Sequence, residues 1–189
     1  MENIILKKLV EEQKLTCYEL SKRSGVPYST INDLLHDKKN ISNITGKNLY
    51  LIARTLKTTS EFLLKPVFYE EIDFDLFRSN VCHFAKHNGK DYIDILIQEN
   101  DIRAYDYMGR KAQSLYLLGM LDHLCHKYEV PLKEEYADLR KTSLDSYLYP
   151  KSVITLYIFD SRVLYRAVKN ADPDFIKFKI VEGEVESVA

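Results

Sequence analysis

Apolar residues recur at intervals of three and four along most of the chain, a spacing that predicts helices rather than strands. In the first third, the segments with this spacing are short and are separated by polar stretches. We expect five helices there, over residues 3–14, 16–24, 27–35, 45–56 and 58–64. The first buries one apolar stripe and exposes lysine and glutamate, so we expect it to close one side of a small helical bundle.

Residues 15–35 hold the most specific pattern, two short helices joined at a glycine. Thr16 is a favourable N-cap, because its hydroxyl can accept a backbone N–H that has no partner within the helix. Gly25 can adopt the positive φ that ends a helix, and Val26 behind it fills the angle between the two helices. Pro27 begins the next helix, where its missing N–H costs nothing. This pattern predicts a helix-turn-helix, an arrangement that places one helix in DNA.

The second helix of this pair has two unlike faces. Its apolar residues fall on one face and are Ile31, Leu34 and Leu35. Its opposite face carries Tyr28, Ser29 and Asn32. Packing of the core requires neither the serine nor the asparagine, so the polar face predicts a binding partner.

Several motifs of this region occur together in one known family. In chain order they are Thr16-Cys17-Tyr18-Glu19-Leu20, Ser24-Gly25-Val26, Ser29-Thr30-Ile31, Ile52-Ala53-Arg54-Thr55-Leu56 and Glu61-Phe62-Leu63. Residues 3–66, which contain them, resemble the XRE-type regulators of the lambda-repressor/Cro superfamily. The resemblance implies a five-helix DNA-binding domain whose third helix lies in the major groove of double-stranded DNA.

The resemblance also implies which side chains touch DNA. The candidates for contacts with base edges are Tyr28, Ser29, Asn32 and Asp33. The candidates for contacts with phosphate are Thr16, Cys17, Tyr18, Thr30, Lys38, Lys39 and Lys47. Asparagine can bond an adenine edge with two hydrogen bonds, whereas lysines and the N–H groups that begin a helix suit phosphate. Many relatives have glutamine or arginine at the base-reading positions and this chain has neither, so the operator sequence stays open.

Length and charge divide the 189-residue chain into two expected domains. Residues 1–66 hold 11 Lys and Arg against 7 Asp and Glu, a net of +4, which leaves −5 for the remainder of a chain whose total is −1. This excess is modest, so two copies acting together would bind DNA better than one. Pro66 is expected to end the fifth helix, and the composition turns acidic and aromatic after it. We therefore expect a helix-turn-helix domain over 1–66 and an oligomerisation or partner-binding domain over 67–189.

The second domain is also expected to be mainly helical, which makes the fold class mainly all-α. We expect helices over residues 73–87, 90–99, 101–108, 113–128, 133–141 and 152–168, and a short strand over 175–180. In the first of these, Phe77, Val81 and Phe84 are expected to point inward. The helix over 113–128 is apolar on nearly all of its faces, which predicts that it forms a domain core or an interface between subunits. This domain resembles the C-terminal parts of XRE-type regulators of mobile elements and toxin-antitoxin operons only vaguely, without a sharp motif.

Two pairs of histidines raise an alternative that involves metal. His83 and His87 lie four residues apart on one predicted helix, and His123 and His126 lie three apart on another. With the adjacent cysteines they would supply donors for a transition metal if the two helices packed together. Without a CxxC spacing, half-exposed positions on helices explain these residues better, and we expect no metal or other cofactor.

Other classes of protein are disfavoured by what the sequence does not contain. Cys17, Cys82 and Cys125 have no paired spacing, which is typical of a reducing cytosol. No signal peptide is visible, and the longest apolar run, over 115–121, is far below the ~20 residues needed to span a bilayer. There is no Gly-rich phosphate loop, nucleophile elbow or HExxH motif. We expect a cytoplasmic protein that is not an enzyme and does not bind membranes.

Three functional hypotheses follow. The first is a homodimeric repressor that binds a palindromic operator in double-stranded DNA. The second is an antitoxin whose acidic domain neutralises a protein toxin while its DNA-binding domain represses its own operon. The third is a regulator that responds to a metal held by the histidines.

Overall fold

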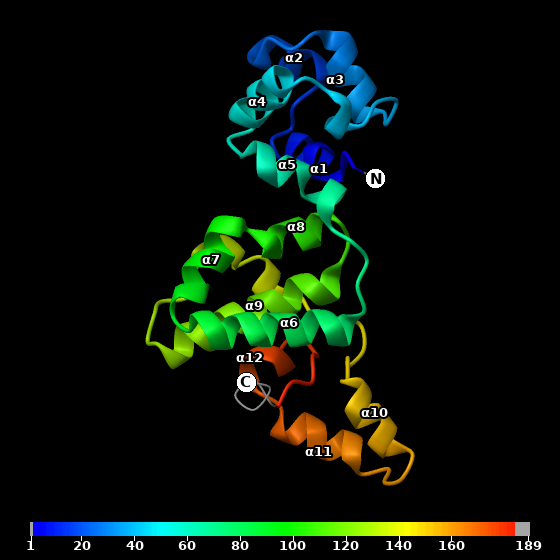
Figure 1. Ribbon diagram of the computed structural model, residues 1–189, viewed down its shortest axis with the longest axis vertical. Helices are drawn as coiled ribbons and strands as arrows, with labels where there is room; N and C mark the ends of the chain where they lie inside the picture. Colours follow the sequence, from blue (N-terminus) through cyan, green and yellow to red (C-terminus); the bar gives the residue numbers. More distant parts are fainter. Residues whose placement is uncertain (1, 184–189) are drawn as a thin grey trace. The chain divides into compact units, whose positions relative to one another are not determined.

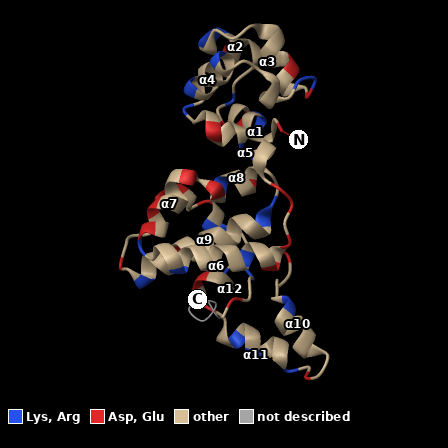
Figure 2. Ribbon diagram, in the orientation of Figure 1, with Lys and Arg blue, Asp and Glu red and all other residues tan. Residues whose placement is uncertain are grey.

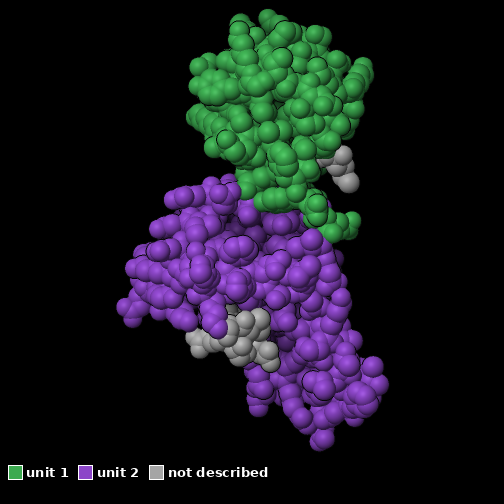
Figure 3. Space-filling view, viewed as in Figure 1, with its two compact units in different colours: residues 1–71, 107–109 green, residues 72–106, 110–189 purple. Residues whose placement is uncertain are grey.

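The computed structural model describes residues 2–183, and within this range it consists of α-helices, short 3₁₀ turns and connecting loops (Figure 1). The predicted all-α fold class is confirmed. The chain divides into two compact units, residues 1–71 with 107–109 and residues 72–106 with 110–189 (Figure 3). No helix among the described residues is both long and apolar enough to cross a membrane.

The first unit contains the five helices predicted for it. They are α1 (Ile4–Glu12), α2 (Cys17–Ser24), α3 (Tyr28–Leu35), α4 (Gly46–Thr55) and α5 (Ser60–Phe68), with a 3₁₀ turn at Ile41–Asn43. Helix α2 packs against α3 and α4, and α5 packs against α1 and α4. Their inward side chains are fully buried and include Ile5, Leu6, Leu20, Ile31, Leu34, Ile52 and Leu63. The spacing of apolar residues therefore located the core of this unit correctly.

Threonine side chains begin three of these helices. Thr16, Thr45 and Thr59 each accept a hydrogen bond from the backbone N–H three residues later, at 3.0–3.3 Å. Each bond satisfies one of the N–H groups that a helix leaves open at its first turn. The starts of α2, α4 and α5 are therefore fixed by local side chains.

Pro66 lies inside α5 and does not end it, contrary to the prediction. A proline lacks only its own N–H, so one helical hydrogen bond is lost, and the Tyr69 N–H still donates to the Lys65 carbonyl at 3.0 Å. Phe62 and Leu63, buried in the bundle, hold the preceding turn. The domain boundary at residue 66 stays a prediction.

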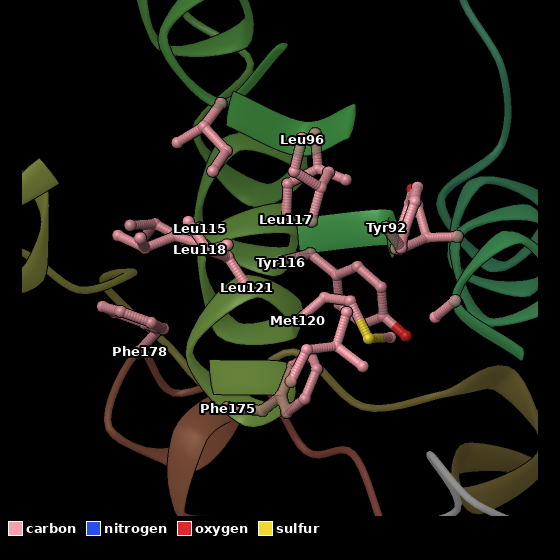
Figure 4. Close-up of a cluster of buried hydrophobic side chains, with 14 of the residues drawn as sticks. Tyr92, Leu96, Leu115, Tyr116, Leu117, Leu118, Met120, Leu121, Phe175 and Phe178 are labelled. Carbon is pink, nitrogen blue, oxygen red and sulfur yellow. The ribbon is translucent and has the colours of Figure 1, made fainter. Parts of the chain in front are cut away.

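The second unit is built around one long helix. Its helices are α6 (Phe74–Asn88), α7 (Asp91–Glu99), α8 (Asp101–Tyr107), α9 (Lys111–Lys127), α10 (Lys151–Tyr157), α11 (Val163–Asn170) and α12 (Pro173–Ile176). Helices α6, α7 and α12 pack against α9, whose side chains are buried on several sides (Figure 4). The apolar stretch predicted at 113–128 is therefore the core of this unit.

A buried ion pair joins the C-terminal segment to this core. Glu182 has no exposed surface, and its carboxylate accepts two hydrogen bonds from Arg78 Nη1, at 2.9 and 3.0 Å. The Tyr116 hydroxyl of α9 donates to the same carboxylate at 2.9 Å. Since an unpaired buried charge is costly, these three bonds make burial of the acid possible.

Two predictions for the second unit are wrong in secondary structure. Residues 133–141, predicted as a helix, form two 3₁₀ turns, Glu134–Tyr136 and Leu139–Lys141. Tyr136 and Leu139 are both buried, and their spacing of three matches the 3₁₀ period. Residues 175–180, predicted as a strand, form the end of α12 and a turn, with a single isolated bridge between Leu148 and Ile180.

Two further expectations concern the faces and ends of helices. The expectation that Phe84 points inward is wrong: it is 54% exposed, because Phe77, Val81 and Ala85 define the buried face of α6. Its ring stacks beside that of Tyr92, with centroids 6.4 Å apart. The helical character predicted over 152–168 is confirmed, but as two helices, α10 and α11, with a turn between them.

Gly119 lies in the middle of α9 where α12 approaches it closely. A Cβ atom there would lie 2.8 Å from Phe175 Cδ1 and 3.1 Å from the Asp174 carbonyl oxygen. We expect Gly119→Ala to lower the free energy of unfolding by about 1–2 kcal/mol in urea titrations, because overpacking outweighs the better helix propensity. Gly46→Ala, whose new Cβ has nothing within 4 Å, is the control and should cause no loss. Equal stability of the two variants would contradict the close approach.

Candidate nucleic-acid interface

A capping box begins α2. The Thr16 hydroxyl oxygen accepts from the Glu19 N–H at 3.2 Å, and the Glu19 carboxylate accepts from the Thr16 N–H at 2.8 Å. These bonds to Thr16 lower the pKa of the Glu19 carboxyl, so it stays charged at neutral pH. The box leaves the N–H groups of Cys17 and Tyr18, the first two residues of the helix, available to another acceptor.

The turn between α2 and α3 is held by two serine side chains that precede Gly25. Gly25 has φ of +74°, the left-handed conformation that a side chain would disfavour. The Ser21 hydroxyl donates to the Val26 carbonyl at 2.8 Å, and the Val26 N–H donates to Ser24 Oγ at 3.2 Å. Val26 is 1% exposed between the helices. The turn at Gly25 and the filling of the angle by Val26 are both present as predicted, so residues near the turn set the angle between α2 and α3.

Helix α3 has the two faces that the sequence predicted. Ile31 and Leu34 are completely buried. On the other side, Tyr28 is 53% exposed and Ser29 is also exposed. Asn32, Asp33 and Thr30 are partly exposed. Within the first unit, the candidate base-contacting side chains therefore remain accessible.

Apart from Thr30, which lies in α3, the candidate phosphate contacts lie on either side of α3 in the sequence. Tyr18 is 65% exposed in the first turn of α2, Thr16 is exposed, and Cys17 is partly buried. Lys38 and Lys39 follow α3 in a loop, and Lys47 lies in the first turn of α4; all three are exposed. Figure 2 shows blue segments around α2, α4 and this loop.

One acidic residue in the same loop is neutralised within the unit. Asp37, next to Lys38, pairs with Lys7 of α1 and accepts a hydrogen bond from Asn3 at 3.3 Å. The bond to the Lys7 ammonium lowers the pKa of the Asp37 carboxyl. The loop thus presents its two lysines without an unpaired carboxylate between them and α3, which favours an anionic partner.

Sequence reasoning missed Asn3, which positions the loop after α3. Its side-chain amide nitrogen donates to the Leu34 and Lys39 carbonyls, both at 2.8 Å, and its oxygen accepts from the buried Ile41 N–H at 2.8 Å. The side chain is 1% exposed. Asn3 falls three and seven residues before Leu6 and Val10, on the apolar stripe of α1, and this position was the available signal of burial.

The histidines are not gathered into one cluster. His83 and His87 are exposed on α6, whereas His123 and His126 contact Asp172 and Asp174 at 2.8 and 2.7 Å. Among the described residues, His123, Asp172 and Asp174 are the group of three whose ligand atoms lie within 4.8 Å of one another.

A lysine pairs with one carboxylate of this group and with a neighbouring aspartate. The Lys177 ammonium donates to Asp174 at 3.0 Å and to Asp122 at 2.8 Å. Burial raises the pKa of the Cys125 thiol on α9, which favours the neutral thiol. These contacts hold α12 against α9 through ion pairs.

Comparison with known proteins bears on the first unit alone. Residues 6–63 match the helix-turn-helix family, a family of DNA-binding transcription regulators. The match begins in α1 and ends in α5, so it spans the turn at Gly25 and all of α3. Searches of curated proteins and of solved structures found no significant match.

Asn3→Ala should lower the free energy of unfolding by roughly 2–4 kcal/mol, because it removes the bonds to the Leu34 and Lys39 carbonyls and leaves the buried Ile41 N–H without a partner. Urea titration followed by circular dichroism measures the change. Asn43→Ala, at an exposed position of the 3₁₀ turn, is the control and should stay within about 0.5 kcal/mol of the parent.

Asn3→Asp separates the two roles of the amide, since it keeps the acceptor but replaces the donor with a carboxylate facing two carbonyls and Asp37. It should be at least as unstable as Asn3→Ala at neutral pH. A stable Asn3→Asp variant would show that the donor bonds to Leu34 and Lys39 do not hold the loop.

Proposed function

We propose, because residues 6–63 form an XRE-type helix-turn-helix segment, that the protein is a sequence-specific transcriptional repressor that binds a palindromic operator as a homodimer. The observation that carries the proposal is the division of α3 into a buried apolar face and an accessible polar face. Its buried side fixes the helix in the bundle through Ile31 and Leu34, and its other side begins with exposed Tyr28 and Ser29.

In this proposal α3 enters the major groove of double-stranded DNA. Asn32 bonds an adenine edge, and Ser29 donates to or accepts from a base. Tyr28 offers its ring to a thymine methyl and its hydroxyl to a phosphate, and Asp33 accepts from a cytosine amino group. The groups assigned to phosphate are Cys17, Tyr18, Thr30, Lys38, Lys39 and Lys47. Thr16, also a candidate, acts by fixing the start of α2, because its N–H and hydroxyl both donate to Glu19 at 2.8 Å. The phosphate contacts fix the register of α3, while the base contacts select the sequence.

Two copies are needed because a single unit offers few cationic contacts. The net charge of residues 1–66 is +4, which gives weak, salt-sensitive binding to phosphate. A two-fold dimer would place two α3 helices in successive major grooves about 34 Å apart, so the operator would be an imperfect palindrome. Binding over a promoter would then exclude RNA polymerase, which is the basis of repression.

The direct test is selection of DNA from a random-sequence pool by the full-length protein, followed by footprinting upstream of its own gene at a stated salt concentration. We expect one enriched palindromic motif and a protected site that contains it. Enrichment of no motif, with equal affinity for all DNA, would refute a sequence-specific regulator.

Asn32→Ala should relax sequence preference at one position of each half-site. A pair of hydrogen bonds to one base is worth about 1–3 kcal/mol of discrimination, roughly 5- to 150-fold in relative affinity for the preferred base. Competition binding with single-base variants of the selected site measures it. Affinity for unrelated DNA should not change.

Lys39→Ala should weaken binding to all DNA sequences alike. It should also reduce the slope of log affinity against log salt by about one for each phosphate that the protein no longer neutralises. Lys90→Ala, which removes an exposed lysine from the second unit, is the control and should leave both affinity and slope unchanged. If Asn32→Ala and Lys39→Ala had the same effects, the proposed orientation of α3 would be wrong.

A further inference from the structure

Helices α10 and α11 form a hairpin of the second unit (Figure 1). Large apolar side chains of this hairpin are exposed. We call residues 151–170 the arm. The two helices pack against each other, yet neither contains a buried side chain. Six large side chains of the arm are 46–83% exposed: Ile154, Leu156, Tyr157, Ile158, Phe159 and Tyr165.

Such a hairpin is expected to have a covering partner. Helices of seven and eight residues are marginal in water, and their stability comes mainly from burial of an apolar face. Ile158 and Phe159, at the turn of the arm, are 77% and 83% exposed, which leaves the most apolar part of the hairpin in contact with solvent. Apolar patches of this kind mark interaction surfaces.

We propose that the arm is the dimerisation surface, where it pairs with the arm of a second copy of the chain. This inference rests on the proposed function, because a palindromic operator requires two copies of the first unit. It adds to that function by assigning the contact to the second unit and leaving the surface of α3 free for DNA. In a two-fold dimer the same patch serves both copies.

The exposed area suits this partner. With a full side-chain area of roughly 150–250 Å² each, the six side chains leave on the order of 600–900 Å² open to solvent. A stable, specific interface buries about 800 Å² on each partner. The exposed apolar area of the arm is therefore of the size that one partner of a dimer buries.

The charges of the arm are only partly offset within the chain, because residues 151–170 hold four Lys and Arg against one Asp. Asp160 pairs with Arg162 at 3.2 Å and with Arg166 at 3.1 Å inside the same arm. Lys151, at the base, pairs with Asp73 of α6 at 2.7 Å. One aspartate offsets only one of the two arginines, so two arms repel each other weakly. The exposed apolar area, and not charge, therefore carries the pairing of two arms.

Sedimentation velocity of the full-length protein over a concentration series tests the proposal. The parent should sediment as a dimer, and the double variant Ile158→Asp/Phe159→Asp should raise the dimer dissociation constant at least about 100-fold, because it places two carboxylates in an apolar contact. Leu76→Asp/Phe84→Asp is the matched control. It makes the same change of charge at two side chains of α6 that are 53% and 54% exposed, and it should remain a dimer.

Circular dichroism and the thermal midpoint establish that each variant is folded, which is expected because the altered side chains lie outside the core. Three results would overturn the proposal: a monomeric parent at every concentration tested, an arm variant that stays a dimer, or a control that dissociates equally. A parent that does not dimerise and instead binds a co-expressed protein of another kind through its arm counts as a monomeric parent, and it overturns the proposal.

Selection of DNA by the same preparations separates this inference from the proposed function. A monomeric parent that still enriches one DNA motif would overturn the arm as the dimer contact and leave a sequence-specific DNA-binding protein. A dimer that dissociates in the arm variant but enriches no motif would support the arm and refute the regulator.

Discussion

The geometry of the candidate DNA-binding surface depends on one buried amide. Asn3 joins the end of α3, at the Leu34 carbonyl, to the loop that follows, at Lys39 and Ile41. Because the bonds to Leu34 and Ile41 are buried, a missing partner there is costly and the bonds resist rearrangement. The same loop carries Lys38 and Lys39, so α1, which makes no proposed contact with DNA, determines where the positive charge lies relative to α3.

Local signals explain why the helices of the first unit were predictable. Thr16 and Gly25 act on backbone groups within three or four residues, so their effects are visible in the sequence. The role of Asn3 was not visible in the sequence, because its hydrogen-bond partners lie 31 to 38 residues away. The contacts of Tyr28, Ser29 and Asn32 with DNA remain predictions. Contacts within the chain show which face of a helix stays accessible. They do not show what binds that face, because the ligand is a separate molecule.

In the second unit, secondary structure was predicted correctly where burial of apolar residues determines it. The prediction failed where ion pairs between residues far apart in the sequence determine it. Helix α9 is surrounded by apolar neighbours, and its sequence is apolar nearly all round. Residues 133–141 were mispredicted because Arg140 binds the buried Asp122 and the Lys133 carbonyl, which folds the segment into tight turns. The segment beyond α12 is likewise held by Glu182 and its bonds to Arg78 and Tyr116. No short-range spacing encodes such pairs.

The two surfaces available for partners differ in how salt affects them. The polar face of α3 and the lysines after it favour an anionic partner, and displacement of counterions makes such binding weaken steeply as salt rises. The arm exposes apolar side chains, whose association is screened little by salt and is strengthened by sulfate or phosphate. Raising the salt concentration should therefore release DNA while a dimer formed through the arm persists. Assembly and DNA binding would then be separable events, the first governed by protein concentration and the second by ionic strength.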